Sequence, residues 1–362
     1  MPISKKLGFL FIYLFIPMPI IGLYLGGMYN FMSFIVIFMG VPLIDFFFTD
    51  NRNPTPDEEN ILKRDKYFKL ITLLYVPTQI ALLIFGMMTI HLATLSWVEW
   101  LGFTMSMGLV SGGVGINLAH ELMHKNDKLQ HIASKILLMT VCYGHFFIEH
   151  VRGHHVRVAT PDDPATARFG ESVYRFIPRT LVGSFKSAWR LEKKRLESKG
   201  YSLFNLHNQF YYIIIPEILI ALGAFMYGGI AVLAYFLLQA FTAIMLLEVV
   251  NYIEHYGLLR KTLPNGQYEK VSIKHSWNAN HWLSNLLLFH LQRHSDHHAN
   301  GAKPYQILKT IDDSPQLPSG YLGLYVIAFI PPLWRFIMDK RVKQYEAYQQ
   351  VNESSCLEAA VE

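Results

Sequence analysis

Six long apolar stretches constrain this chain more than any other feature of its sequence. The hydrocarbon core of a bilayer is about 30 Å thick, which a helix of about 20 apolar residues crosses. Only 16% of the residues are charged, against roughly 25% in soluble domains. We therefore predict an all-α integral membrane protein with six transmembrane helices. The expected helices cover roughly residues 7–28, 30–49, 70–92, 96–118, 210–228 and 230–252.

The basic residues predict how these helices are oriented. No Lys or Arg occurs within 7–51, 70–124 or 210–259. Cytoplasmic loops of membrane proteins carry an excess of Lys and Arg. The six helices are therefore expected as three hairpins that point away from the cytoplasm, with all 32 basic residues on the cytoplasmic side.

The rest of the chain, which we interpret as one membrane domain over 1–362, is expected at the cytoplasmic face. It comprises the regions 119–209 and 253–335 and a polar tail, 340–362, for which we expect loose order. The apolar segments 136–147 and 282–291 are too short to span and should pack under the bundle. A third, 321–334, is long enough to lie in the membrane interface.

Nine of the 16 histidines fall in four short motifs beside the expected cytoplasmic helix ends. The motifs are HELMHK with His120 and His124, EHVRGHH with His150, His154 and His155, NYIEHYG with His255, and LQRHSDHH with His294, His297 and His298. Helical spacings of three and four residues put side chains on one face. Clustered imidazoles repel when protonated, whereas a bound cation keeps them neutral as ligands. Nine ligands are too many for one ion, so the sequence predicts two metal ions at the cytoplasmic face. Imidazole suits zinc, copper, nickel and iron alike, and ligand type does not choose among them.

One alternative starts from His120-Glu121-x-x-His124, which also matches the HExxH helix of zinc proteases, where the glutamate is the general base. An intramembrane zinc protease would need only one further ligand. It would leave the other seven clustered histidines without a role.

The four histidine motifs together resemble the membrane-bound alkane 1-monooxygenase (alkane hydroxylase) family, within the histidine-box superfamily of membrane desaturases and hydroxylases. NYIEHYG, and ATPDDPATAR after the second motif, narrow the resemblance to alkane hydroxylases and the related xylene monooxygenases. The resemblance covers about residues 40–335. It implies that the nine histidines bind two iron ions, which use O2 and two external electrons to hydroxylate the terminal methyl group of medium- to long-chain n-alkanes. A fatty-acyl or xylene-type hydroxylase or desaturase remains the alternative within the superfamily.

Carboxylates beside the histidines are candidates to orient the imidazoles and offset the charge of the ions. Glu121, Glu254 and Asp163 are the main candidates, and Glu149 and Asp296 also lie within the motifs.

A linear alkane offers no polar group, so its binding site should be an apolar channel from the bilayer to the metal ions. In the fourth apolar stretch, Gly108, Gly112 and Gly113 would open space above His120, unless they serve close helix packing. Side chains expected to set the depth of the channel are Met105 in the same stretch, and Ile37 and Phe38 in the second.

The electrons must come from another protein. The two cysteines, Cys142 and Cys356, form no CxxC pair, and the sequence has no nucleotide-binding fingerprint. The resemblance implies a rubredoxin, reduced by an NADH-dependent flavoprotein reductase, as the donor at the inner membrane of a bacterium. The basic run 186–200 could bind such an acidic donor, or contact anionic lipid. Nothing in the sequence suggests nucleic acid as a partner.

Overall fold

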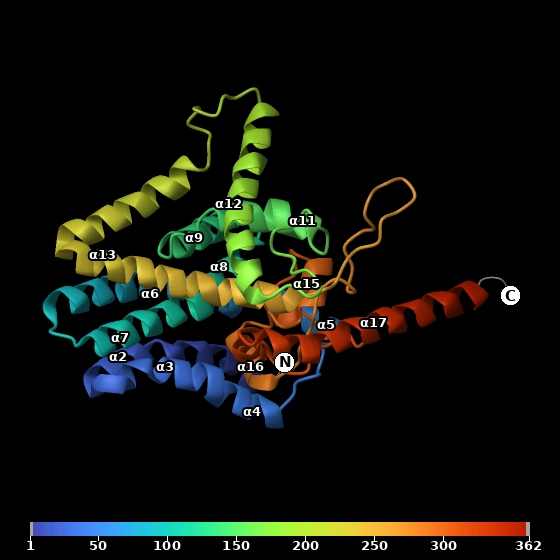
Figure 1. The fold of residues 1–362 in the computed structure, drawn as a ribbon, viewed down its shortest axis with the longest axis horizontal. Helices are drawn as coiled ribbons and strands as arrows, with labels where there is room; N and C mark the ends of the chain where they lie inside the picture. The colour runs from blue at the N-terminus through green and yellow to red at the C-terminus, as the bar shows by residue number, and fades with distance from the viewer. Residues whose placement is uncertain (1–2, 360–362) are drawn as a thin grey trace.

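The computed structural model describes the backbone of residues 3–359 and side chains within 6–351. Over these residues the chain is all-helical, with isolated β-bridges and no strand (Figure 1). Five of the described helices are long and apolar enough to cross a membrane: Lys6–Leu25, Gly27–Phe47, Lys66–Leu92, Trp97–Met123 and Tyr211–His255. The fold class predicted from the sequence, an all-α integral membrane protein, is confirmed.

The first two of these helices are irregular, because each combines several kinds of helical turn. The first comprises α1 (Ile3–Gly8), the 3-10 segment η1 (Phe9–Phe15) and α2 (Pro17–Leu25). The second comprises η2 (Gly27–Phe31), α3 (Met32–Ile35), the π-helical segment η3 (Val36–Gly40) and α4 (Val41–Phe47). Large apolar side chains on their outer surfaces are exposed, such as Phe46 and Leu43, as expected for groups that face lipid.

The next two helices form the middle of the bundle. After α5 (Pro56–Arg64), α6 runs over Lys66–Leu92 and begins at Asp65, whose side chain accepts from the backbone N–H of Tyr67. The second helix comprises α7 (Trp97–Val110), the π-helical segment η4 (Ser111–Ile116) and α8 (Asn117–Met123). Ser96 and Glu99 form a capping box at its start, which satisfies two backbone donors. This helix is the most buried of the five and ends at the first histidine motif.

The last apolar element, α13 (Tyr211–His255), is broken at Gly228 and Gly229, where the ribbon turns sharply (Figure 1). Gly229 has a φ of 64°, a left-handed conformation that glycine adopts without strain. The break falls between the predicted stretches 210–228 and 230–252. The two arms of α13 thus match these stretches.

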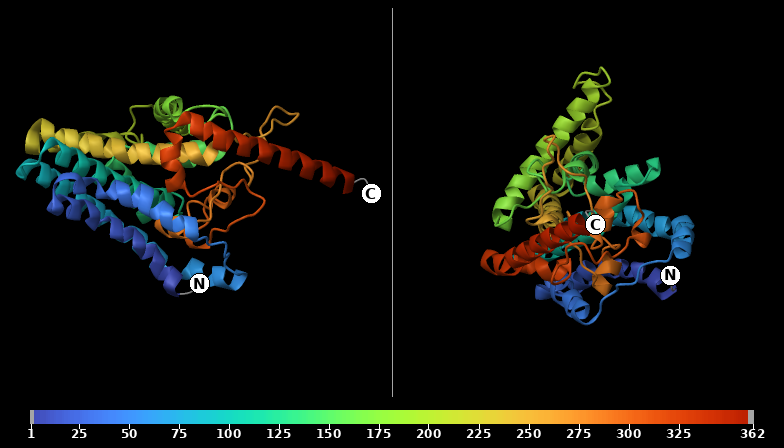
Figure 2. Two further views of the ribbon diagram at one scale, coloured as in Figure 1. Left: turned by 60° about the horizontal axis from the view of Figure 1, so that its bottom comes forward. Right: turned by 90° about the vertical axis from the view of Figure 1, so that its right-hand side faces the viewer.

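The remaining helices gather at the end of the bundle that carries the histidine motifs. They are α9 (Lys128–Met139), α10 (Phe146–Glu149), the π-helical segment η5 (His150–His154), α11 (His155–Arg157), α12 (Val173–Glu197), α14 (Trp282–Leu287), α15 (His294–Ala299), η6 (Tyr305–Ile307), α16 (Tyr321–Ala328) and α17 (Pro331–Ala359). The apolar segments 136–147 and 282–291 contribute Leu138, Phe146 and Leu286 to the main core. The last helix, α17, begins with turns that bury Trp334 and Met338 and is helical as far as Ala359, whereas loose order in the tail stays a prediction (Figure 2).

Candidate metal centre

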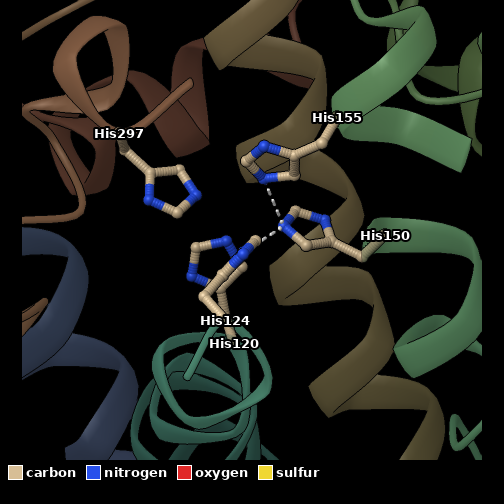
Figure 3. Close-up of side chains that lie close together, drawn as sticks. All are labelled: His120, His124, His150, His155 and His297. Carbon is tan, nitrogen blue, oxygen red and sulfur yellow. Dashed lines mark hydrogen bonds between the residues drawn. The ribbon is translucent and has the colours of Figure 1, made fainter. Parts of the chain in front are cut away.

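The nine histidines of the four motifs meet at the end of the bundle in two adjacent groups. One group holds His120, His124, His150, His155 and His297, and the other holds His154, His255, His294 and His298. Within each group the candidate ligand nitrogens all lie within 4.8 Å of one another. Figure 3 shows the five rings of the first group pointing inward from α8, η5, α11 and α15. The structure thus brings together all nine predicted ligands.

The spacing of the nitrogens matches that of ligands on one ion. In the first group, the Nε2 atom of His150 lies 3.1 Å from that of His124 and 3.0 Å from that of His155. In the second, the Nε2 atom of His294 lies 3.2 Å from that of His255 and 3.0 Å from that of His298. Two nitrogens bound to an ion at about 2.1 Å and near right angles are about 3 Å apart. Each group can therefore hold one ion.

Neighbouring residues in the sequence serve different groups. His154 and His155 are adjacent in the chain, yet they belong to the second and the first group respectively, and His297 and His298 are divided in the same way. The rings of His155 and His298 stack across the boundary, with centroids 4.4 Å apart. The two groups therefore share two short helical segments and are fixed relative to each other.

A buried imidazole nitrogen needs a partner, and this requirement tests whether the site fits metal ions. The Nε2 atoms of His154 and His297 are buried and have no hydrogen-bond partner among the described residues. Both nitrogens belong to the groups described above. Bound cations would satisfy them without protons, so the residues present fit two metal ions.

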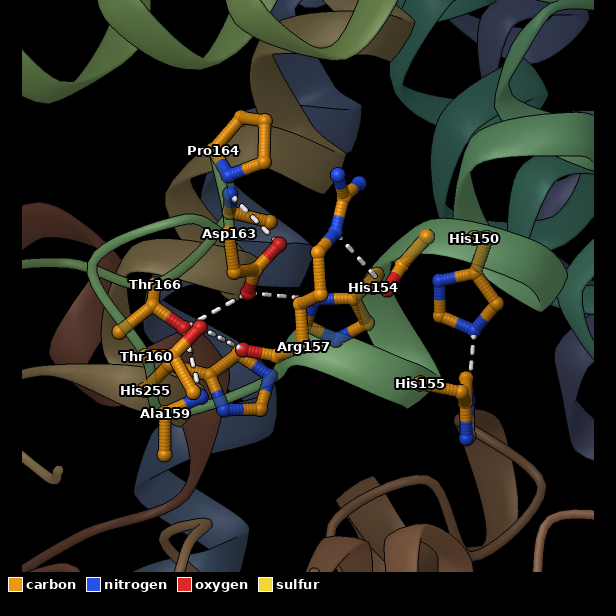
Figure 4. A network of polar contacts seen from close by, with 12 residues as sticks. His150, His154, His155, Arg157, Ala159, Thr160, Asp163, Pro164, Thr166 and His255 are labelled. Carbon is orange, nitrogen blue, oxygen red and sulfur yellow. Dashed lines mark hydrogen bonds and ion pairs between the residues drawn. The ribbon is translucent and has the colours of Figure 1, made fainter. Parts of the chain in front are cut away.

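Asp163 supports the second group through His154 (Figure 4). Its Oδ2 atom accepts from Nδ1 of His154 at 2.9 Å and from the Thr166 hydroxyl at 2.6 Å. This bond fixes the tautomer of His154 and leaves Nε2 for an ion, the arrangement typical of metal-binding histidines. Burial pushes the pKa of Asp163 up, but His154 and Thr166 outweigh it, and the pKa lies below its usual value. Asp163 is thus ionised at neutral pH.

The electrostatics of the ring clusters favour cation binding. Burial, followed by repulsion from neighbouring rings, lowers the pKa of His150, His155 and His297 well below the usual value of imidazole. The same causes lower the pKa of His294 and His298. These rings are neutral at neutral pH, as metal ligands must be.

The other candidate carboxylates have different partners. An oxygen of Glu254 lies 3.3 Å from Nε2 of His294, within the second group. Glu121 pairs with Lys125 at 2.6 Å and accepts from the backbone N–H of Tyr305. Of the two carboxylates, only Glu254 thus lies against a candidate ligand nitrogen.

Two further carboxylates join segments that carry histidines to the rest of the protein. Glu149 accepts from Arg157 at 2.7 Å, and Asp296 pairs with Lys303 at 2.5 Å. These contacts stabilise the segments rather than single rings.

A cavity lined mostly by apolar side chains adjoins the metal centre. His120, His150 and His294 form part of its wall, together with Asn117, Asn251 and Glu254, and the rest of the lining is apolar or glycine. The apolar lining comes from η1, η3, α7, η4, α13, α14 and α16 and includes Ile12, Phe15, Leu246, Leu287 and Leu322. Such a cavity suits an apolar chain whose end must lie against the ions.

The predicted channel residues fall into two sets. Ile37, Gly112 and Gly113 line the cavity. Phe38 stacks on Tyr325, with ring centroids 4.5 Å apart. Gly108 packs against α13, where an added Cβ would lie 2.6 Å from the backbone oxygen of Gln239.

Met105, the remaining predicted channel residue, is half-buried on α7 and is not in the cavity wall. Asn117 and Asn251 also line the cavity but were not predicted from the sequence. Their positions three and four residues before His120 and His255 are the signal that could have revealed them.

The fold and the site define a membrane protein with a histidine-rich candidate metal centre. Its similarity to known proteins identifies the class. Residues 95–328 match the fatty acid desaturase family. Alkane 1-monooxygenase 1 of Pseudomonas aeruginosa is 46% identical over 327 residues, which cover 88% of this chain and 84% of the relative. Alkane 1-monooxygenase 1 of Alcanivorax borkumensis is 42% identical over 92% of this chain and 84% of its own length.

The chain belongs to the alkane 1-monooxygenase family and is a multi-pass membrane enzyme. The hydroxylase component of a xylene/toluene monooxygenase from Pseudomonas putida is less similar, at 29% identity over 79% of this chain and 77% of its own length. The resemblance inferred from the histidine motifs is confirmed.

Proposed function

We propose that this enzyme hydroxylates the terminal methyl group of medium- to long-chain n-alkanes, with two iron ions as its cofactor. The observation that carries the proposal is the apolar cavity whose wall includes candidate ligands of both groups, His120 and His294. The relatives that share most of the chain are named alkane 1-monooxygenases. In the net reaction, RH, O2, two electrons and two protons give ROH and H2O.

An unactivated C–H bond offers no acidic proton to a base and no electrophile to a nucleophile. When bound, the two irons would supply the oxidant that such a bond requires. The five-histidine group and the four-histidine group would each hold one of them, and Asp163 would keep His154 in the tautomer that binds metal.

The protein's own contribution is to orient the substrate and exclude water. The apolar lining can hold an alkyl chain only by shape, since such a chain makes no hydrogen bonds. Ile37 and Gly113 would contact the chain, and the wall formed by His120 and His150 would set where its end stops.

The electron donor is proposed to be a rubredoxin, reduced by an NADH-dependent flavoprotein reductase, at the cytoplasmic face of a bacterial inner membrane. Two observations support a surface entry point for electrons. His124 and His155 are half-buried, while the other seven ligands are buried, so the first group lies closest to solvent. Gly301 lies beside the rings of His124 and His155, and a Cβ there would be 3.4 Å from the His155 ring. A partner that docks on this side would approach the first group, and the basic run 186–200 is the second proposed docking surface.

The alternative function, an intramembrane zinc protease, fits the structure less well than alkane hydroxylation does. His120 and His124 lie with three further imidazoles rather than with a carboxylate. Glu121, the would-be general base, is paired with Lys125.

The test is the oxidation of octane, dodecane and hexadecane by the purified protein with a rubredoxin and its reductase. We expect 1-alkanols whose formation requires O2 and is lost in His298→Ala. His145→Gln serves as a control, because His145 is a buried imidazole outside both groups. Turnover of fatty-acyl chains alone, with no alkanol from any alkane, would contradict the proposal.

A further inference from the structure

Gln79 is a buried amide in the middle of α6, a helix that we place in the bilayer. A polar group in the hydrocarbon region is costly unless its hydrogen bonds are satisfied within the protein. Gln79 is 1% exposed. The metal centre and the cavity do not include it, so its presence needs another explanation.

The amide of Gln79 is satisfied by a buried polar cluster. Its Nε2 atom donates to the Ser111 hydroxyl at 2.8 Å and lies 3.4 Å from the Thr140 hydroxyl. Its Oε1 atom accepts from the Tyr75 hydroxyl at 2.7 Å. Gln239 of α13 extends the cluster by donating to the Thr140 carbonyl at 3.0 Å. The cluster therefore connects α6, η4, the segment after α9, and α13.

Gln79 lies against two residues of the π-helical segment η4. Ser111 is its first residue. Gly115 is its fifth, and a Cβ there would lie 3.2 Å from Oε1 of Gln79. The Tyr75 hydroxyl also lies 3.4 Å from the carbonyl of Val110, just before the segment begins. Gln79 thus packs along one side of the π turn.

The opposite side of η4 is the cavity wall. Gly112, Gly113 and Ile116 line the cavity, and the helix continues directly into His120. A π turn is rare and occurs mostly as a single-turn bulge inside an α-helix, and a segment with three glycines has low helix propensity. External hydrogen bonds are a means of holding such a turn in one conformation.

We propose that Gln79 is a positioning residue that holds the π turn η4 and thereby fixes the cavity wall relative to His120. This inference rests on the proposed function, because it concerns where the alkyl chain lies. A displacement of the wall by about 1 Å is enough to change reactivity at the bound carbon. The predicted consequence is a change in which carbon of the alkane is hydroxylated.

The experiment compares the ratio of 2-alkanol to 1-alkanol formed from octane by Gln79→Leu, Ser111→Ala and Ser106→Ala. Ser106 is the matched control. It is a buried serine on the same helix that donates to the backbone oxygen of Asn30 at 2.6 Å, and its hydrogen bonds do not involve the π turn. Thermal unfolding midpoints and iron content are measured for each variant.

We expect Gln79→Leu and Ser111→Ala to raise this ratio by about threefold to tenfold, the factor that corresponds to one hydrogen bond. Ser106→Ala should lower the thermal unfolding midpoint about as much as Ser111→Ala does, but it should keep the wild-type ratio of 2-alkanol to 1-alkanol. Gln79→Glu, which keeps the acceptor for Tyr75, should give a ratio between those of wild type and Gln79→Leu.

An unchanged ratio in Gln79→Leu and Ser111→Ala, or the same rise in Ser106→Ala, would overturn the proposal. If Gln79→Leu does not fold, Ser111→Ala decides, since it removes the same hydrogen bond from the other side. The absence of any alkanol from the wild-type enzyme would instead contradict the proposed function.

Discussion

The two short segments that supply six of the nine imidazoles, α15 and η5 with the adjoining α11, differ in the type of helical turn they form. In α15, a regular helix, His294 and His298 are four residues apart, and their Nε2 atoms lie 3.0 Å apart. In η5, a π turn, His150 and His155 are five residues apart, and their Nε2 atoms are also 3.0 Å apart. The backbone N–H of His155 bonds to the carbonyl of His150, which brings residues five apart into line.

This difference decides which of the two groups each histidine joins. In a regular α-helix, His150 would share a face with His154 at the i, i+4 spacing. The π turn instead pairs His150 with His155 and directs His154 to the other group. In α15, a regular helix, the adjacent His297 and His298 also join different groups, so the π turn explains the pairing of His150 with His155 rather than the division itself.

The largest effect is expected from removal of single ligands. The four-histidine group should lose its iron ion in His154→Ala and in His298→Ala. The five-histidine group should lose its iron ion in His155→Ala and in His124→Ala. Each variant should lose more than about 100-fold in alkanol formation, since the loss of one ion is a loss of the cofactor. Mössbauer spectra of 57Fe-loaded protein measure which ion remains. If His154→Ala leaves the same spectrum as His124→Ala, the assignment of His154 based on the π turn is incorrect.

A smaller effect is expected for Asp163→Asn. Loss of the carboxylate that accepts from His154 should weaken iron binding at the four-histidine group by about 10- to 100-fold. Competition with a chelator measures the affinity. Asp162→Asn is the matched control, because Asp162 is the exposed neighbour of the buried Asp163. Equal affinities in the two variants would show that Asp163 does not support the ion.

Gly153→Ala tests the packing of the π turn. A Cβ at Gly153 would lie 2.5 Å from Nη2 of Arg157 and 2.6 Å from both carboxylate oxygens of Glu149. These flexible side chains must move and their ion pair must shift, at a cost of about 1–2 kcal/mol. The thermal unfolding midpoint should fall accordingly. Gly223→Ala, where no atom lies within 4 Å of the added Cβ, should leave the midpoint unchanged or raise it slightly.

The smallest effect concerns pH and the metal-free protein. The pKa of His155 is lowered by burial, so the unfolded state binds a proton below about pH 6.5 that the folded state does not. The contribution of His155 to the free energy of unfolding is therefore present above that pH and is lost as the pH falls. His155→Gln should reduce the slope of stability against pH, between pH 6.5 and 5, by up to about 1.4 kcal/mol per pH unit. An unchanged slope in denaturation experiments would indicate that the ring is not neutral when folded.

The long apolar helices could be predicted from the sequence, because apolar stretches of about 20 residues report directly on the bilayer. The orientation that Lys and Arg indicate stays a prediction. The gathering of the nine histidines could also be predicted, since buried imidazoles at helical spacing have few uses other than metal binding. Which histidine joins which group could not be predicted, because the π turn at His150–His154 leaves no signal in the spacing HVRGHH. Nor could the placement of Gly108 against α13 rather than the cavity, which depends on long-range packing.

Analysis of the metal content of the purified protein tests the central claim most directly. We predict two iron ions per chain, falling to about one in His298→Ala, because the two groups of imidazoles hold one ion each. A single zinc ion per chain, unaffected by His298→Ala, would contradict the account.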